Sequence, residues 1–213
     1  MWIEGQPYAP RRPLDARRAG VAMIYQELSL APHLSVAENI LLGMEPHRGP
    51  VLDWTRMRRI AREALARVGR PDISVDARTG SLSIAEQQLV EIGRAVAVGC
   101  RVLVLDEPTS SLTKQDIARL FDLIRALKAD GHAIVYISHF LEEVKTISDR
   151  FTVLRDGQSV GGGRTAEASP ESIVAMMVGR DVSELYPRSP RNPGEVLLES
   201  VDLIGEHRSR RAS

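Results

Sequence analysis

The sequence has 213 residues, of which 43% are hydrophobic and only 4% aromatic, and its 28 basic residues balance 28 acidic ones. This length allows a full domain with an aliphatic core, and the balanced charge gives no reason to expect binding to nucleic acid. No stretch approaches the ~20 apolar residues that span a bilayer, so we expect a soluble or peripheral protein. The single cysteine, Cys100, cannot form an internal disulfide and is expected in the core.

The first half of the chain predicts one strand followed by helices. An apolar run over residues 21–25 predicts a buried strand that ends at Gln26. Ser35, with a glutamate three positions later, has the spacing of a capping box and predicts a helix to Leu42. Further helical patterns cover residues 55–68 and 83–98. We therefore expect a mainly helical subdomain over about residues 30–100.

The middle of the chain alternates strands and helices. The short apolar run at residues 102–105 predicts a strand covered on both faces. Thr113 caps an amphipathic helix that Gly131 closes, and a second apolar strand follows at residues 133–137. A helix is expected from about residue 140 to 147. This alternation predicts an α/β fold with a mainly parallel core sheet.

The last part of the chain predicts a hairpin, a helix and then a linker. Asp156-Gly157 is a hairpin turn signal, and Ser169 opens a helix that ends at Gly179. Three prolines and a glycine mark residues 186–194 as a linker. We therefore expect one domain over residues 1–185, and after the linker the start of a new unit or a disordered tail over residues 195–213.

Polar residues follow three of the predicted strands. Gln26 ends the first, Asp106 and Glu107 end the second, and His139 follows the third. Because ligands gather at the carboxyl ends of strands in an open α/β sheet, this pattern favours nucleotide hydrolysis. One acid could hold a metal while its neighbour orients a water. Ser83 starts a helix, where it could be a simple N-cap or part of an anion site.

Taken in order, these motifs resemble the nucleotide-binding domain of ABC transporters. Gln26 matches the Q-loop, the run that ends in Asp106 and Glu107 matches Walker B, and His139 matches the switch histidine. The signature motif and the D-loop correspond to Leu82, Ser83, Ile84, Ala85, Glu86, Gln87 and Gln88, and to Ser110, Ser111, Leu112 and Thr113. The resemblance covers roughly residues 1–180 and implies an ABC-type fold, incomplete at its N-terminus.

Within that superfamily, residues 25–30, 35–40 and 82–88 resemble the first cassette of double-cassette importers of sugars such as ribose, xylose, arabinose or galactose. The resemblance implies ATP hydrolysis coupled to monosaccharide uptake at the cytoplasmic face of the cell membrane. It implies transmembrane permease subunits and a second ATP-binding cassette as partners, and indirectly a periplasmic or extracellular sugar-binding protein. In that reading, residues 195–213 begin the second cassette.

The resemblance also implies roles for individual residues, with ATP and Mg²⁺ as cofactors. Asp106 would hold Mg²⁺ through water, and Gln26 would sense the metal and the attacking water. Glu107 would polarise that water, and His139 would contact the γ-phosphate. Residues 82–87 of the signature and 110–112 of the D-loop would serve nucleotide binding, with Ser83 completing the site of an opposite cassette.

One motif of the family does not occur in the sequence. No Gly-x-x-x-x-Gly-Lys-[Ser/Thr] is present, and the three glycines at 161–163 before Arg164 have the wrong spacing. We therefore expect the isolated chain to bind ATP poorly, and a truncated or mis-started gene product or a fragment would account for this. A non-catalytic assembly or regulatory module and a soluble ABC ATPase remain alternative readings.

Overall fold

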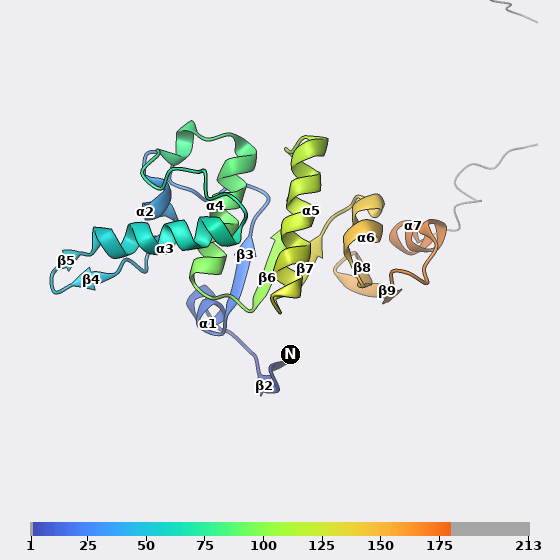
Figure 1. Ribbon diagram of the computed structural model, residues 1–213. Coiled ribbons are helices and arrows are strands. Elements are labelled where there is room, and N and C mark those ends of the chain that lie inside the picture. The colour runs from blue at the N-terminus through green and yellow to red at the C-terminus, as the bar shows by residue number, and fades with distance from the viewer. Residues whose placement is uncertain (1, 180–213) are drawn as a thin grey trace, which may run out of the picture.

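The structure, a computed structural model, describes residues 2–179 (Figure 1). The predicted linker and the segment after it lie outside the described residues. The elements follow in the order β1 (Trp2–Ile3), β2 (Gln6–Pro7), α1 (Pro13–Arg18), β3 (Val21–Ile24), α2 (Val36–Leu41), β4 (His47–Arg48), β5 (Val51–Leu52), α3 (Trp54–Arg67), η1 (Thr79–Ser81), α4 (Ile84–Ala97), β6 (Val102–Asp106), α5 (Lys114–Ala129), β7 (Ala133–Ile137), α6 (Leu141–Ile147), β8 (Arg150–Arg155), β9 (Gln158–Arg164) and α7 (Pro170–Val178).

A three-stranded parallel sheet lies at the centre, in the order β3-β6-β7. Ile24 pairs with Leu105, and Asp106 pairs with Ile137. The other strands form separate antiparallel hairpins, β1–β2, β4–β5 and β8–β9. The predicted α/β class with a parallel central sheet is confirmed.

Side-chain caps set the helix boundaries. The predicted capping box at α2 is present, because the Ser35 N–H and hydroxyl both donate to Glu38 Oε2, at 2.8 and 2.5 Å. Helix α3 begins one residue earlier than predicted, since the Asp53 carboxylate accepts a bond from the N–H of Arg56 at 3.0 Å. The short helix α1 and the β4–β5 hairpin were not predicted, because elements of six and two residues carry too little periodicity.

The core joins the helical region α2–α4 to one face of the sheet. Cys100 is buried in it, as predicted. The largest fully buried side chains are almost all aliphatic: Ile40, Met57, Leu65, Ile92, Leu103, Leu105, Leu127, Val36, Val90 and Val96, together with the polar Asn39 and Thr79.

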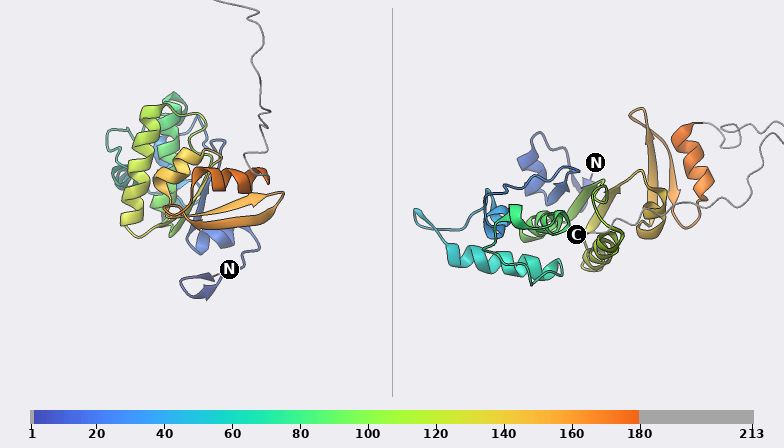
Figure 2. Two further views of the ribbon diagram at one scale, coloured as in Figure 1. Left: turned by 90° about the vertical axis from the view of Figure 1, so that its right-hand side faces the viewer. Right: turned by 90° about the horizontal axis from the view of Figure 1, so that it is seen from above.

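The opposite face of the sheet is open. Helices α4 and α5 lie on one face of the sheet (Figure 2). Leu103 and Leu105 of β6 belong to the same buried core as residues of these helices. On the other face Met23, Val135 and Ile137 keep 41%, 48% and 43% of their surface exposed. The strand predicted at residues 102–105 is fully buried on the face of Leu103 and Leu105, whereas Val102 and Val104 on its other face are half-buried.

Candidate functional site

The three predicted strand ends meet at one edge of the sheet. Asp106 is the last residue of β6, Gln26 follows β3 by two residues, and His139 follows β7 by two. Because these strands are parallel neighbours, their carboxyl ends lie at the same edge. This is the edge at which open α/β sheets bind ligands.

Glu107 and His139 form a direct pair at this edge. The imidazole Nδ1 of His139 lies 2.9 Å from Glu107 Oε1, and both side chains are accessible, with 56% and 30% of their surface exposed. The backbone of Glu107 adopts the left-handed region, with φ 43°, which is unfavourable for a residue with a Cβ. Its N–H donates to the carbonyl of Ile137 at 2.9 Å. The structure thus holds a carboxylate and an imidazole together, facing solvent.

A second carboxylate supports the loop that carries His139. Glu143, in the first turn of α6, accepts hydrogen bonds from the Tyr136 hydroxyl at 2.8 Å and from the Ser138 hydroxyl at 2.9 Å. Burial raises the pKa of Tyr136, and its bond to Glu143 raises it further. Sequence reasoning missed Glu143, because an acid in the first turn of a helix ordinarily indicates only a favourable dipole interaction.

The remaining residues of this edge make fewer contacts. Gln26, Ser110 and Ser111 are exposed, and within residues 2–179 their side chains form no hydrogen bond. Leu112 is half-buried and packs against the core. The structure therefore brings Glu107 and His139 into contact, and leaves Gln26, Ser110 and Ser111 accessible at the strand and loop ends.

The predicted signature segment begins helix α4 with a capping box. The N–H and hydroxyl of Ser83 donate to Glu86 Oε2, each at 2.9 Å, and Glu86 also pairs with Arg70 at 2.8 Å. The hydrogen bond from the Ser83 backbone, followed by the bond from Arg70, lowers the pKa of Glu86. Leu82, Ala85 and Gln87 are half-buried, and Ile84 is exposed. Ser83 is thus an N-cap here, and its part in an anion site stays a prediction.

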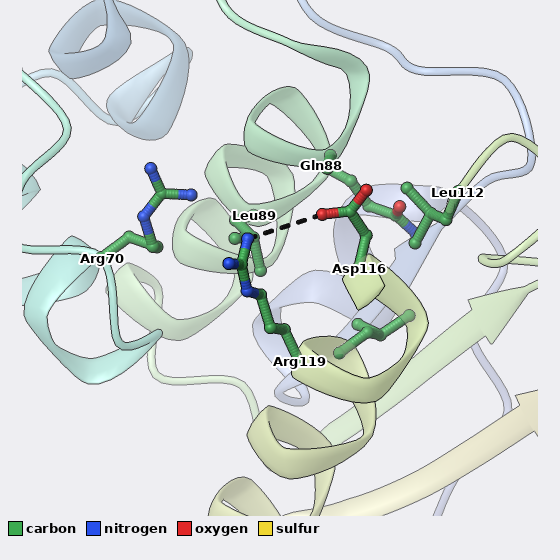
Figure 3. A pocket seen from close by; sticks show the side chains of 8 residues that line it. Arg70, Gln88, Leu89, Leu112, Asp116 and Arg119 are labelled. Atoms are coloured by element: carbon green, nitrogen blue, oxygen red, sulfur yellow. Dashed lines mark ion pairs between the residues drawn. The ribbon is translucent and has the colours of Figure 1, made fainter. Parts of the chain in front are cut away.

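A small hollow lies between α4, α5 and Arg70 (Figure 3). Leu89 and Leu112 form part of its wall, and Asp116 pairs with Arg119 at 3.7 Å beside them. Its charged groups are already ion-paired, so the hollow offers no free reacting group.

The residues at the sheet edge fit one kind of metal binding. Among residues 2–179 no group of three or more His, Cys, Asp or Glu side chains is placed to hold a metal ion. Mg²⁺ typically takes one or two carboxylates, several waters and substrate phosphates rather than a protein cage. The half-buried Asp106 carboxylate with the exposed amide of Gln26 matches that limited donor set.

Comparison with known proteins identifies the class. The family described as "ABC transporter" matches residues 1–110, and the chain belongs to this family. Solved structures agree on the fold: cbiO1 from Clostridium perfringens superposes with a TM-score of 0.66 at 21% identity, over 86% of this chain and 73% of that one. The ADP form of the ATP-binding cassette MJ1267 gives a TM-score of 0.64 at 24% identity, over 84% of this chain and 72% of that one.

Closer sequence relatives are sugar import proteins. The chain is 46% identical to the ribose import ATP-binding protein RbsA of Chromobacterium violaceum, over 96% of this chain and 41% of the relative. It is 47% identical to a putative ribose/galactose/methyl galactoside import ATP-binding protein of Burkholderia ambifaria, over 94% of this chain and 39% of the relative. The chain therefore spans about two fifths of the length of these relatives.

None of the helices in residues 2–179 is long and apolar enough to cross a membrane.

Proposed function

We propose that this chain is part of the ATP-binding and ATP-hydrolysing subunit of a monosaccharide importer. The observation that carries the proposal is the Glu107–His139 pair, which lies beside Asp106 at the ligand-binding edge of a parallel sheet. Family membership and the ribose and galactose import relatives support the substrate class.

In phosphoryl transfer the protein takes little part in covalent chemistry. Its main tasks are to position the reactants and to stabilise charge. Glu107 accepts a hydrogen bond from the attacking water and orients it. His139, held by Glu107 at Nδ1, directs its other ring nitrogen to the γ-phosphate. Asp106 and Gln26 are the residues that would hold Mg²⁺, which would supply positive charge to offset that of the phosphates.

The partners that complete the proposal lie outside the chain. Transmembrane permease subunits would bind it at the cytoplasmic face of the membrane, and a second cassette would face Ser83 and the D-loop residues 110–112. A sugar-binding protein outside the membrane would act on it only through the permease. The phosphate-cradling loop, which is absent from the sequence, must also come from another segment.

The experiment that tests this proposal provides the phosphate-cradling loop on a separate segment. The full chain is co-expressed with a segment that carries the Gly-x-x-x-x-Gly-Lys-[Ser/Thr] loop of the Chromobacterium violaceum relative, and ATP binding and hydrolysis are measured. We expect binding only with the added segment. Glu107→Gln should then lower hydrolysis by about 10²- to 10⁴-fold with binding retained. Glu142→Gln removes an exposed charge on α6 and is the matched control. An unchanged rate of ATP hydrolysis in Glu107→Gln would contradict the proposal.

A second candidate function is a non-catalytic assembly module. The exposed start of α4 favours it, since Ile84 keeps 52% of its surface accessible and Ser83 is also exposed. In this role the helix start contacts nucleotide bound by another subunit. Nucleotide binding that a loop-bearing partner restores, together with hydrolysis that does not depend on Glu107, would favour it.

A further inference from the structure

Two buried polar side chains of α4 bind the loops that leave two neighbouring strands. Gln88, which is 7% exposed, donates from Nε2 to the carbonyl of Pro108 at 2.7 Å. Glu91, which is 3% exposed, accepts at Oε1 from the N–H of Ser29 at 2.6 Å and from its hydroxyl at 2.8 Å. Residues three apart share a helix face, so one face of α4 carries both bonds.

These two loops carry the groups placed at the sheet edge. Pro108 directly follows Glu107, and Ser29 lies three residues after Gln26. Their strands, β6 and β3, are parallel neighbours. One helix is therefore bonded to two loops that come from segments about 80 residues apart in the chain.

The bond from Gln88 lies next to a strained residue. Glu107 has a φ of 43°, and such a backbone persists only where its surroundings hold it. Ile137 fixes its N–H from the sheet side at 2.9 Å. Gln88 of α4 binds the carbonyl of Pro108, the residue after Glu107. The direction of the Glu107 side chain therefore depends on the position of α4.

The carboxylate of Glu91, which accepts the hydrogen bonds from Ser29, is buried. A buried carboxylate is costly unless it is hydrogen-bonded, and here one oxygen receives both donors of Ser29. The other oxygen, Oε2, has no hydrogen-bond partner among the described residues. Ser29 is therefore the residue that holds this carboxylate, and the carboxylate in turn holds the loop.

We infer that Gln88 and Glu91 are positioning residues that place the Glu107 loop and the Gln26 loop in one frame set by α4. Ser83 is the N-cap of this helix, so a displacement of its N-terminal end carries both loops with it. The mechanical link rests on the contacts alone, whereas its consequence for catalysis rests on the proposed function.

Hydrogen exchange of the full chain tests the link without any need for ATP hydrolysis. Gln88→Met removes the donor and keeps the volume, and we expect roughly three- to tenfold faster exchange in residues 107–112. If α4 is the shared frame, exchange in residues 26–31 also rises. Faster exchange in residues 107–112 alone would show two separate contacts and would overturn the inference.

The second link has its own matched pair of variants. Glu91→Leu removes both bonds to Ser29 and should speed exchange in residues 26–31 by a similar factor, whereas Glu91→Gln keeps an acceptor and should restore slow exchange. Should Glu91→Leu fail to fold, Ser29→Ala removes one bond from the exposed side. Val96→Ala, which loosens the same helix near its other end, is the control for general destabilisation.

Two readouts separate positioning from mere stability. The ring-proton NMR shifts of His139 should move in Gln88→Met and stay unchanged in Val96→Ala, because only the first variant turns Glu107. In the complex with the loop-bearing segment, Gln88→Met should lower kcat with KM unchanged. Absence of hydrolysis in the unsubstituted chain as well as in every variant would defeat the proposed function and leave the exchange result standing. Unchanged exchange and unchanged His139 shifts would overturn the inference whatever the hydrolysis rate.

Discussion

The helical region α2–α4 and the sheet β3-β6-β7 differ in how much of their apolar surface is buried. In the helical region Met57, Leu65 and Val90 have no exposed surface. The sheet is covered on one face only and leaves Val135 and Ile137 half exposed. Parallel sheets in proteins are ordinarily covered on both faces. This sheet therefore leaves more apolar surface accessible than the helical region, although both contribute to one continuous core.

The largest expected effect separates the two regions by stability. Met57→Ala should cost about 2–5 kcal/mol, because it leaves a cavity among fully buried side chains. Ile137→Thr on the open face should change the free energy of unfolding by less than about 0.5 kcal/mol. Urea denaturation of the full chain at two protein concentrations measures both. Equal costs would mean that the sheet face is covered in solution.

A buried polar contact gives the next largest effect. Asn39 has no exposed surface, and its amide bonds Thr79 Oγ1 at 2.7 Å and both backbone groups of Ala31 at 2.8 and 3.0 Å. Asn39→Ala should cost about 2–3 kcal/mol in the same assay, because it leaves buried groups unpaired. Ser110→Ala in the exposed turn after β6 is the control and should be nearly neutral. A loss below about 0.5 kcal/mol for Asn39→Ala would contradict this account.

The sheet should be the alkali-sensitive region. Burial and the bond to Glu143 raise the pKa of Tyr136 above its ordinary 10.0. The folded state then keeps the proton that the unfolded state loses, so this stability is complete below pH 10 and is lost as pH rises further. Tyr136→Phe should flatten that alkaline slope in thermal denaturation. Tyr25→Phe, at an exposed site, should leave it in place.

The helical region should be the acid-sensitive one, with the smallest effect. The Ser83 backbone and Arg70 lower the pKa of Glu86, so the unfolded state binds its proton more tightly. The resulting stability is present above the ordinary pKa of glutamate and is lost as pH falls through the lowered value. Glu86→Gln should reduce the acid slope below about pH 4. Glu63→Gln, in an exposed ion pair with Arg59, should not.

Local signals in the sequence predicted much of this fold. Ser35, Ser83 and Thr113 each cap a helix in the structure, because an N-cap needs only a side chain and the next turn of backbone. The turn at Asp156-Gly157 forms for a similar reason, since both residues adopt positive φ. Such features involve neighbours in sequence and can be read without knowing the tertiary structure.

Contacts between distant segments could not be predicted in this way. The Gln88–Pro108 and Ser29–Glu91 bonds join residues 20 and 62 positions apart. In the sequence, Glu91 looks like an ordinary residue of an amphipathic helix, and Gln88 is singled out only as the end of the signature motif. The open sheet face was also unpredictable, because the residue pattern of an apolar strand does not show whether a second layer of structure covers it.

The sequence by itself determined the order of the longer strands and helices, the family and the polar residues at three strand ends. Tertiary structure alone decided that Glu107 contacts His139, that Glu143 supports this pair, and that α4 bonds both loops. The physical reason is that caps, periodicity and turns act within a few residues of backbone. Hydrogen bonds between side chains depend on how whole elements pack, and that packing is a property of the assembled chain.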